Sequence, residues 1–449
     1  MVSAPIATPG LPILGLRAPP WYESSGITLH GAERRTIRAW NRGWCTGVRS
    51  VRYRGGVLLS LGSNAPFEIS AKARDLHFRS LVIDTHADTT QRFIFGNFDL
   101  GARHADGSVD IPRMREGGLA AIFFAVWIKG TITGREAIER ARVQIEAIRR
   151  QVALHPNDLV AARTAGDIRR ARAAGKIAIL TAVEGGHMMN GDLGILREFA
   201  SLGVSYMTLT HMQNTDWADA STAQPAHNGL SEFGRQAIRE MNRLGMVVDV
   251  SHVSDKTVCD VLAVSDAPVL ASHSSCQALC KTPRNLSDEM IKALAGKGGV
   301  VQINFHMGFL SQEFRDAEKA QPGLWKQIDA EAEKRCGEND ACQILESDKI
   351  VRGFVAEGKL PRVEWTLIVD HVDHAVNVAG VDHVGLGSDF DGAEMPYGME
   401  DASCLPRITE ALLQKGYSES DIEKILGGNV LRLMQDVEAA AKSGRGKIA

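Results

Sequence analysis

The sequence predicts an α/β fold, a (β/α)8 TIM-type barrel, on the basis of two observations. From Ala71 onward, eight short apolar runs alternate with segments of helical periodicity. The runs are continuously apolar instead of alternating, which is typical of strands buried on both faces of a parallel sheet. Eight such β/α units close most simply into a barrel, and reactive groups in such barrels follow the carboxyl ends of the strands.

The elements of this barrel can be assigned in order along the chain. The predicted strands are LVID (81–84), AAIFFAV (120–126), IAILTAV (177–183), YMTLT (206–210), MVVDV (246–250), APVLAS (267–272), GVVQINF (299–305) and HVGLGS (383–388). Helical periodicity between them predicts helices over 134–155, 193–203, 230–245 and 286–299. Several of these end at a glycine suited to a left-handed C-terminal cap.

Three segments fall outside the eight units. Residues 1–70 combine proline, small residues and arginines without a helical or strand period, so we expect a poorly ordered N-terminal extension before a barrel domain over 71–440. The polar segment 310–361 predicts inserted helices over one rim, and both a lid and a dimer contact are open interpretations. After the eighth strand, 405–416 and 421–442 predict helices that close against the outside of the barrel.

The composition excludes several classes of protein. Hydrophobic residues make up 44% of the 449 residues and charged residues 23%, which excludes a fibrous or wholly disordered chain. The 51 Lys and Arg nearly balance 54 Asp and Glu and form no basic stripe, so a nucleic-acid partner is not expected. No run reaches the roughly 18 apolar residues of a membrane-spanning helix. We therefore expect no transmembrane segment and, because no export signal is visible, a cytoplasmic protein.

The cysteines predict neither a disulfide scaffold nor a thiolate metal site. There are seven in the chain, and no CxxC pair occurs among them. Cys336 and Cys342 could close a small loop, but we expect reduced thiols at both positions.

Ionisable side chains follow six of the eight predicted strands. They are His86 and Asp88 after the first, Glu184 after the third, His211 after the fourth, His252 after the fifth, His273 after the sixth and Asp389 after the eighth. A single buried histidine is more often a hydrogen-bonded core residue, but so many ionisable groups at one barrel mouth would be costly to bury without a cation. Imidazole and carboxylate ligands suit a divalent ion such as zinc, so the pattern predicts a metal site.

Other histidines are interpreted differently. His371 and His374 have the i, i+3 spacing of a helical chelate, but their helix lies on the predicted outer ring. A surface or capping role is therefore favoured for both. His187 closely follows Glu184, and we expect it to support a metal ligand without binding the metal itself.

Seven stretches carry a resemblance to a known family. In chain order they are VIDTHAD (82–88), AVEGGH (182–187), YMTLTHMQNTDWAD (206–219), GLSEFGRQAIREMNRLGMVVDVSHVSD (229–255), APVLASHSSCQAL (267–279), PRNLSDEM (283–290) and GLGSDFDG (385–392). Together they resemble the zinc-dependent membrane or renal dipeptidases, which lie within the wider amidohydrolase-like barrels. The resemblance runs from about Ala71 to Gln435 and leaves out the first 70 residues and the 310–361 segment.

The resemblance implies a site with two zinc ions. His86 and Asp88 would bind one ion, and His252 and His273 would bind the other. Glu184 would bridge the two. Such a site lowers the pKa of a bound water and polarises the scissile carbonyl.

The resemblance also implies roles for residues around the metals. Asp389 would act as general base and then as general acid, with Asp391 as a neighbouring orienting residue. His211 would hydrogen-bond the carbonyl oxygen of the scissile amide. Arg284 would hold the terminal carboxylate of the substrate, a group that fits a guanidinium fork.

The implied activity is hydrolysis of dipeptides with a free C-terminal carboxylate, including C-terminal D-residues and some β-lactams. Family members commonly form homodimers. Two alternatives stay open: another barrel hydrolase, such as a cyclic-amide, deaminase or phosphotriester enzyme, and a catalytically inactive binding homologue. A carboxylated lysine that bridges the metals would favour another barrel hydrolase, but the third strand offers Glu184 instead. Loss of a metal ligand or of Asp389 would favour an inactive homologue, but the sequence retains all of these residues.

Overall fold

The computed structural model describes residues 67–95 and 98–445. The predicted N-terminal extension over 1–70 lies outside the described residues except for 67–70. Ser70 is the N-cap of the first helix, where its side chain accepts a hydrogen bond from the backbone N–H of Ala73.

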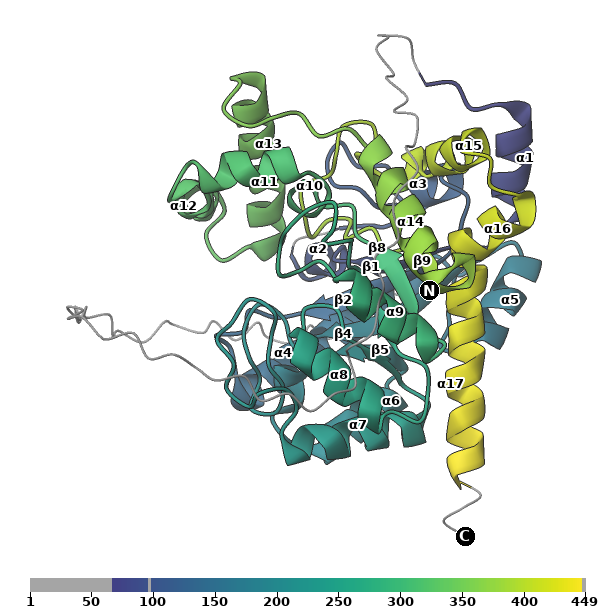
Figure 1. The fold of residues 1–449 in the computed structure, drawn as a ribbon, viewed down its shortest axis with the longest axis vertical. Helices are drawn as coiled ribbons and strands as arrows, with labels where there is room; N and C mark the ends of the chain where they lie inside the picture. The colour runs from purple at the N-terminus through teal and green to yellow at the C-terminus, as the bar shows by residue number, and fades with distance from the viewer. Residues whose placement is uncertain (1–66, 96–97, 446–449) are drawn as a thin grey trace, which may run out of the picture. The chain divides into compact units, whose positions relative to one another are not determined.

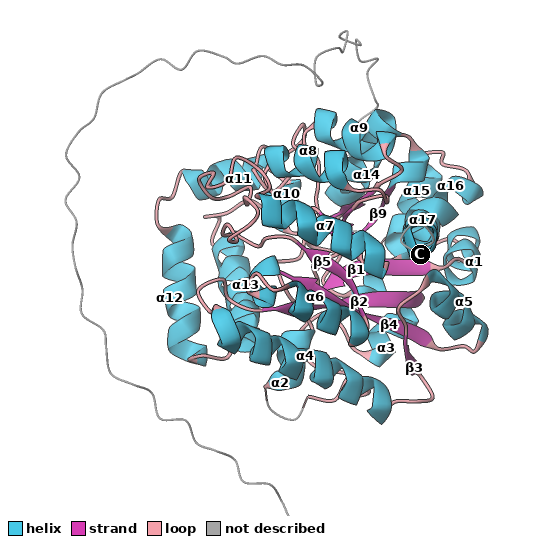
Figure 2. Ribbon diagram, turned by 90° about the horizontal axis from the view of Figure 1, so that it is seen from below, coloured by secondary structure: helices cyan, strands magenta, loops and turns pink. Residues whose placement is uncertain are grey.

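The predicted barrel is confirmed, with parallel strands surrounded by helices (Figures 1 and 2). Its strands are β1 (Val82–Ala87), β2 (Leu119–Trp127), β4 (Ile177–Glu184), β5 (Val204–Thr208), β6 (Val247–Asp249), β7 (Leu270–Ala271), β8 (Val300–Ile303) and β9 (Val384–Leu386). Neighbours in the sheet follow the chain order β1-β2-β4-β5-β6-β7-β8-β9, and every pairing is parallel. Because the strands are buried on both sides, their side chains build the core of the protein.

Backbone contacts beyond the end of β9 bring the last strand back to the first. The N–H of Asp389 donates to the carbonyl of His86 at 3.0 Å, and the N–H of Asp88 donates to the carbonyl of Phe390 at 2.8 Å. These two bonds bring the residues after β9 beside those at the end of β1, and so place the first and last candidate site segments next to each other.

One strand was not predicted. The three residues of β3 (Leu159–Ala161) pair with β4 outside the barrel path. A run this short has no readable period, so only its tertiary pairing identifies it.

The helices that surround the strands include the four that were predicted. Their bounds are α1 (Ala71–Arg79), α2 (Thr90–Ile94), α3 (Ile111–Glu116), α4 (Gly134–Leu154), α5 (Ala165–Ala173), α6 (Leu193–Ser201), α7 (Glu232–Leu244), α8 (Asp255–Val264), α9 (Asp288–Gly296) and α14 (Thr366–Ala379). Serine caps fix several of the starts: Ser231, Ser254 and Ser287 each accept a hydrogen bond from a backbone N–H in the first turn of α7, α8 and α9. The predicted glycine cap of α7 is Gly245, whose φ of 69° is in the left-handed region.

The segment between β8 and β9 contains the predicted inserted helices. They are α10 (Met307–Leu310), α11 (Gln312–Lys319), α12 (Leu324–Cys336) and α13 (Asp340–Ala356). Figures 1 and 2 both place α11 to α13 on the side of the barrel opposite to α1 and α5. The expectation of reduced thiols here was wrong, because Cys336 and Cys342 form a disulfide across the short connection between α12 and α13.

The C-terminal segment forms closing helices, with one interruption that the sequence did not predict. α15 (Pro406–Gln414) and α16 (Glu419–Glu423) precede a π-helical turn over Lys424–Gly428, and α17 (Asn429–Arg445) follows it. The turn brings Gly427 against the barrel, where a Cβ atom would lie 2.1 Å from the carbonyl oxygen of Leu81. The close approach of the two backbones requires glycine there and breaks the helix that periodicity predicted as continuous.

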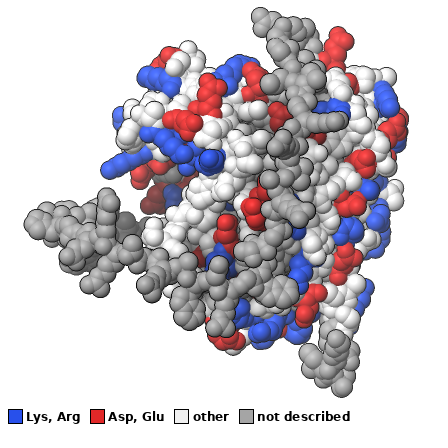
Figure 3. Space-filling model, in the orientation of Figure 1, with Lys and Arg blue, Asp and Glu red and all other residues white. Residues whose placement is uncertain are grey.

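Within residues 67–95 and 98–445, every helix is too short or too polar to cross a bilayer. On the face shown in Figure 3, the acidic and basic side chains of the described residues are interspersed. They do not form a large patch of one sign on this face.

Candidate metal centre

The first part of the site comes from β1. His86 lies near the end of the strand and Asp88 directly after it, so the two side chains share one side of the extended segment as predicted. His86 Nε2 is 3.5 Å from Asp88 Oδ2, and both side chains are buried.

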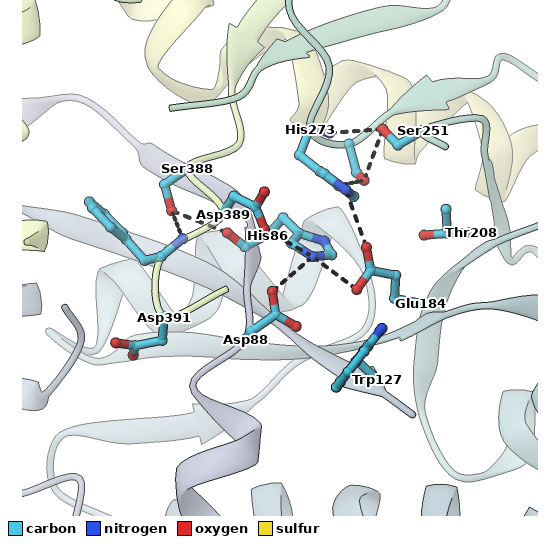
Figure 4. A network of polar contacts seen from close by, with 12 residues as sticks. His86, Asp88, Trp127, Glu184, Thr208, Ser251, His273, Ser388, Asp389 and Asp391 are labelled. Atoms are coloured by element: carbon cyan, nitrogen blue, oxygen red, sulfur yellow. Dashed lines mark hydrogen bonds and ion pairs between the residues drawn. The ribbon is translucent and has the colours of Figure 1, made fainter. Parts of the chain in front are cut away.

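Glu184, the last residue of β4, lies between His86 and His273 (Figure 4). Its Oε1 is 2.9 Å from His252 Nε2 and 3.2 Å from His273 Nε2. Its Oε2 is 3.6 Å from His86 Nε2. One carboxylate therefore faces both halves of the site with different oxygens, which is the arrangement expected of a bridging ligand.

His252 and His273 form the second half of the site. Their Nε2 atoms are 2.9 Å apart, although they follow different strands, β6 and β7. His252 has a φ of 70°, a left-handed conformation that is uncommon outside glycine and is concentrated at functional sites.

The imidazoles of His86 and His273 are oriented by partners that the sequence analysis missed. The hydroxyl of Tyr206 donates to the carbonyl of Thr85, so it accepts from His86 Nδ1 at 2.6 Å. Ser272 Oγ donates to Asp249 Oδ2, so it accepts from His273 Nδ1 at 2.7 Å. Both rings therefore carry their proton on Nδ1 and present the lone pair of Nε2 to the site.

Two buried aspartates lie beneath the site. Asp249 accepts hydrogen bonds from Thr208, Ser251 and Ser272, and Asp84 accepts from the backbone N–H and hydroxyl of Ser388. Burial raises the pKa of Asp84 to about 6. The sequence analysis did not identify these two aspartates. The sequence feature that could have indicated them is a charged residue inside an apolar run, as in LVID and MVVDV.

Asp389 faces His86 from the segment after β9, with 3.9 Å between its Oδ1 and His86 Nε2. Its other oxygen, Oδ2, accepts a hydrogen bond of 2.8 Å from the side-chain amide of Asn304, which the sequence analysis also missed. Asp391 points away, since its oxygens accept from the Thr89 hydroxyl and the Ser108 N–H, each at 2.6 Å. The backbone of Asp389 is left-handed, with a φ of 66°.

His211 and Trp127 form one wall of the site. The ring of His211 lies 4.4 Å from that of His252 and 5.5 Å from that of Trp127, measured between centroids. Burial lowers the pKa of His211 to about 4, so the imidazole is neutral near pH 7.

Arg284 is a buried cation beside these groups, with only 4% of its surface exposed. Its Nη2 makes a long hydrogen bond of 3.4 Å to the carbonyl of His273, and its Nε has no hydrogen-bond partner among the described residues. Burial, and after it the charge of Arg284, lower the pKa of His252 well below its ordinary range. Most of the hydrogen-bonding capacity of this guanidinium is therefore available to a ligand.

The donor atoms fit divalent cations. Three groups of ligand atoms lie close together: His86, Glu184 and His273; Glu184, His211 and His252; and His86, Asp88 and Asp389. His86 Nε2 and Asp88 Oδ1 are buried without hydrogen-bond partners among the described residues. A cation would satisfy these atoms and separate the lone pairs of His252 and His273, so the residues present suit the metal that the sequence predicted.

The charges of the carboxylates support the same conclusion. Burial, together with the charge of Glu184, raises the pKa of Asp88 to about 7. Carboxylates this crowded repel one another, and a bound cation relieves that repulsion.

The remaining histidines lie outside this cluster. Of the surface or capping role expected for His371, the surface position was wrong, because its side chain is 0% exposed and hydrogen-bonded on both ring nitrogens. Its Nε2 donates to the carbonyl of Leu310 at the end of α10, which is a capping contact. His374 is largely buried, with its Nε2 2.7 Å from Asp288 Oδ1 at the start of α9. His187 packs near the site, and burial lowers its pKa.

Comparison with known proteins agrees with this geometry. The family model described as membrane dipeptidase, peptidase family M19, matches residues 70–447. Dipeptidase tcpJ of Claviceps purpurea is 37% identical over 352 residues, which cover 76% of this chain and 72% of the relative.

Solved structures share the fold. The probable dipeptidase PvdM from Pseudomonas aeruginosa has a TM-score of 0.69 and 29% identity, covering 82% of this chain and 98% of that one. A metallopeptidase from Rhodobacter sphaeroides, liganded with a phosphinate mimic of the dipeptide L-Ala-D-Ala, has a TM-score of 0.63 and 25% identity, covering 80% of this chain and 99% of that one. The chain therefore belongs to the membrane dipeptidase family of metal-dependent hydrolases.

Proposed function

We propose that this protein is a two-zinc dipeptidase that cleaves dipeptides with a free C-terminal carboxylate. The observation that carries the proposal is Arg284, a buried guanidinium with free donors beside a cluster of metal-ligand side chains. A buried cation of this kind suits a carboxylate, which can accept two of its hydrogen bonds at once. A longer peptide would place an uncharged amide there and leave the arginine poorly paired.

In this proposal the metal ligands are those that the resemblance implies. His86 and Asp88 would hold one zinc, His252 and His273 would hold the other, and Glu184 would serve both. The chemistry that zinc supplies when bound is polarisation of the scissile carbonyl and a lowered pKa for the attacking water.

Asp389 moves the proton. Because Asn304 donates to its Oδ2, Oδ1 is the atom left to take a proton from the attacking water. The same oxygen then returns the proton to the leaving amine, so that one carboxylate serves as general base and general acid in turn.

His211 supports the carbonyl oxygen as charge develops on it. Its neutral imidazole can donate one hydrogen bond, and its contact with Trp127 and His252 limits movement of the ring. A preorganised donor of this kind typically contributes about 3 to 4 kcal/mol to transition-state stabilisation.

The proposed substrate range follows from two groups of the substrate, its C-terminal carboxylate and its scissile amide. The mimic of L-Ala-D-Ala bound by the Rhodobacter sphaeroides relative supports acceptance of a D-residue at the C-terminal position. We extend the proposal to some β-lactams, because these compounds, like dipeptides, have an amide bond close to a carboxylate.

The proton-transfer role is tested with Asp389→Asn. We expect about two metal ions per chain in the wild type and in the variant, with turnover of a dipeptide lowered at least ~10²-fold in the variant. Metal analysis and dipeptide hydrolysis on the same samples measure both. Asp391→Asn is the matched control, since Asp391 also has a left-handed backbone but points away from the cluster. Full activity of Asp389→Asn would remove Asp389 from the mechanism.

The carboxylate role is tested with Arg284→Ala. We expect a large loss of kcat/KM, roughly 100-fold or more, on dipeptides with a free C-terminus, because a buried charge pair is lost. Amidated dipeptides, which lack the negative charge, should lose little. An equal loss on both substrates would contradict the carboxylate role.

A further inference from the structure

The short helix α10, at the start of the inserted segment, is held by the loop that carries Arg284. The last carbonyls of a helix have no partners within the helix. In α10 these carbonyls accept from side chains outside it: Gly308 from Cys280 Sγ at 3.5 Å, Phe309 from Asn285 Nδ2 at 2.8 Å, and Leu310 from His371 Nε2 at 3.0 Å. Two of these donors, Cys280 and Asn285, belong to the 275–287 loop on either side of Arg284.

Asn285 joins the loop to the helix directly. It is buried and follows Arg284 in the chain, and its amide nitrogen also donates to the carbonyl of Cys280 at 2.9 Å. The one side chain thus closes the loop on itself and ties it to Phe309. A carboxylate of the same shape could not donate either bond and would face two carbonyl oxygens instead.

His371, on α14, also links the 275–287 loop to α10. Its Nδ1 accepts from the backbone N–H of Cys276 at 3.0 Å, while its Nε2 donates to Leu310. One nitrogen must accept and the other donate, so the ring is neutral, in agreement with burial lowering its pKa to about 4. The ring therefore links the beginning of the 275–287 loop to the end of α10.

The helix in turn contacts Arg284. The ring of Phe309 lies 5.3 Å from the guanidinium carbon of Arg284, within the range of a cation–π contact, and packs edge-to-face on His306. The positions of Phe309 and Arg284 are thus set by the same hydrogen bonds.

We infer that Asn285 and His371 are positioning residues that fix Arg284 against the first helix of the inserted segment, so that α10 forms part of the carboxylate site. The inference rests on the proposed role of Arg284. It gives the beginning of the insertion a function in substrate binding, and it requires no contact between the substrate and either Asn285 or His371.

Two variants test the inference, Asn285→Asp and His371→Gln, each with a control of equal burial. Asn429 donates to the carbonyls of Val381 and Val384 far from the site, and His77 is hydrogen-bonded on both ring nitrogens to Thr409 and Gly117. Asn429→Asp and His77→Gln therefore reproduce the loss of buried hydrogen bonds without touching Arg284. The readout is the ratio of kcat/KM for a dipeptide to that for its amide.

We expect Asn285→Asp and His371→Gln to lower this ratio roughly 10-fold or more, mainly through a higher KM for the free dipeptide, because a small displacement of a binding group is costly. The two controls should leave the ratio unchanged. In an Arg284→Ala background, Asn285→Asp should not lower the ratio further, since the group that it positions is gone.

The outcomes separate the inference from the proposed function. If Arg284→Ala alters the ratio but neither positioning variant does, the inference is overturned and the carboxylate role stands. An equal loss on the free dipeptide and on the amide, or a change that the controls share, would also overturn it. If Arg284→Ala leaves the ratio intact, both the proposed function and the inference fail. Should Asn285→Asp not fold, His371→Gln alone decides between these outcomes.

Discussion

At the scale of single residues, the metal centre depends on side chains that bind no metal. Tyr206 and Ser272 engage the Nδ1 atoms of His86 and His273, which leaves each Nε2 free for a cation. Beneath the site, Asp249 accepts the hydrogen bond that the Ser272 hydroxyl donates. Their positions along the sequence do not reveal them, because a hydroxyl in a strand has many uses and only the closed barrel decides which imidazole it meets.

The contribution of Tyr206 leads to a prediction about metal affinity. Tyr206→Phe removes the acceptor of the His86 Nδ1 proton, so the ring can turn or change tautomer, and we expect metal affinity to fall about 10- to 100-fold. Competition with a chelator on the purified protein measures this independently of turnover. Tyr417→Phe is the control, since the Tyr417 hydroxyl likewise donates a hydrogen bond, to the carboxylate of Asp373 on the outer helices. Unchanged affinity in Tyr206→Phe would show that the hydroxyl does not orient the ligand.

At the scale of elements, apolar runs predicted all eight barrel strands, and several of the observed strands are shorter than predicted. β6, β7 and β9 keep only two or three residues in the sheet, because the chain then turns toward the mouth of the barrel. The left-handed residues His252 and Asp389 lie in these turns. Hydrophobicity reports burial, and these residues stay buried after they leave the sheet, so the strand ends could not be read from it.

The insertion shows the same limit for helices. Its polar composition predicted helices over a rim and left a lid and a dimer contact as open interpretations. The hydrogen bonds from Cys280, Asn285 and His371 to α10 connect its beginning to the Arg284 loop, through contacts between residues that are far apart in the sequence. Periodicity within one element does not encode its contacts with another.

At the scale of the whole molecule, buried histidines join segments that are distant in the chain. His77 on α1 contacts the hydroxyl of Thr409 on α15 at 2.7 Å and the carbonyl of Gly117 after α3 at 2.8 Å. Burial lowers its pKa to about 4, so the ring is neutral in the folded protein at pH values where it is protonated in the unfolded chain.

This difference predicts a dependence of stability on pH. Between pH 6.5 and about 4, the unfolded state binds the extra proton, so the free energy of unfolding falls as the pH is lowered, by roughly 2 to 3 kcal/mol from His77 alone. Urea unfolding of the metal-free protein at pH 7 and pH 4.5 measures the change. His77→Gln should be less stable at pH 7 but lose less on acidification than the wild type. Identical losses in the two proteins would assign the pH dependence to other groups.

The sequence by itself determined the barrel, its strand order and the ionisable residues at the strand ends, because burial on both faces leaves continuous apolar runs and because chain order sets strand order in a parallel barrel. The tertiary structure alone decided which oxygen of Glu184 faces which histidine, that Asn304 holds Asp389, and that Arg284 is held against α10. These facts depend on distances between side chains from different strands and loops. Such distances exist only once the barrel has closed, so no local pattern in the chain can record them.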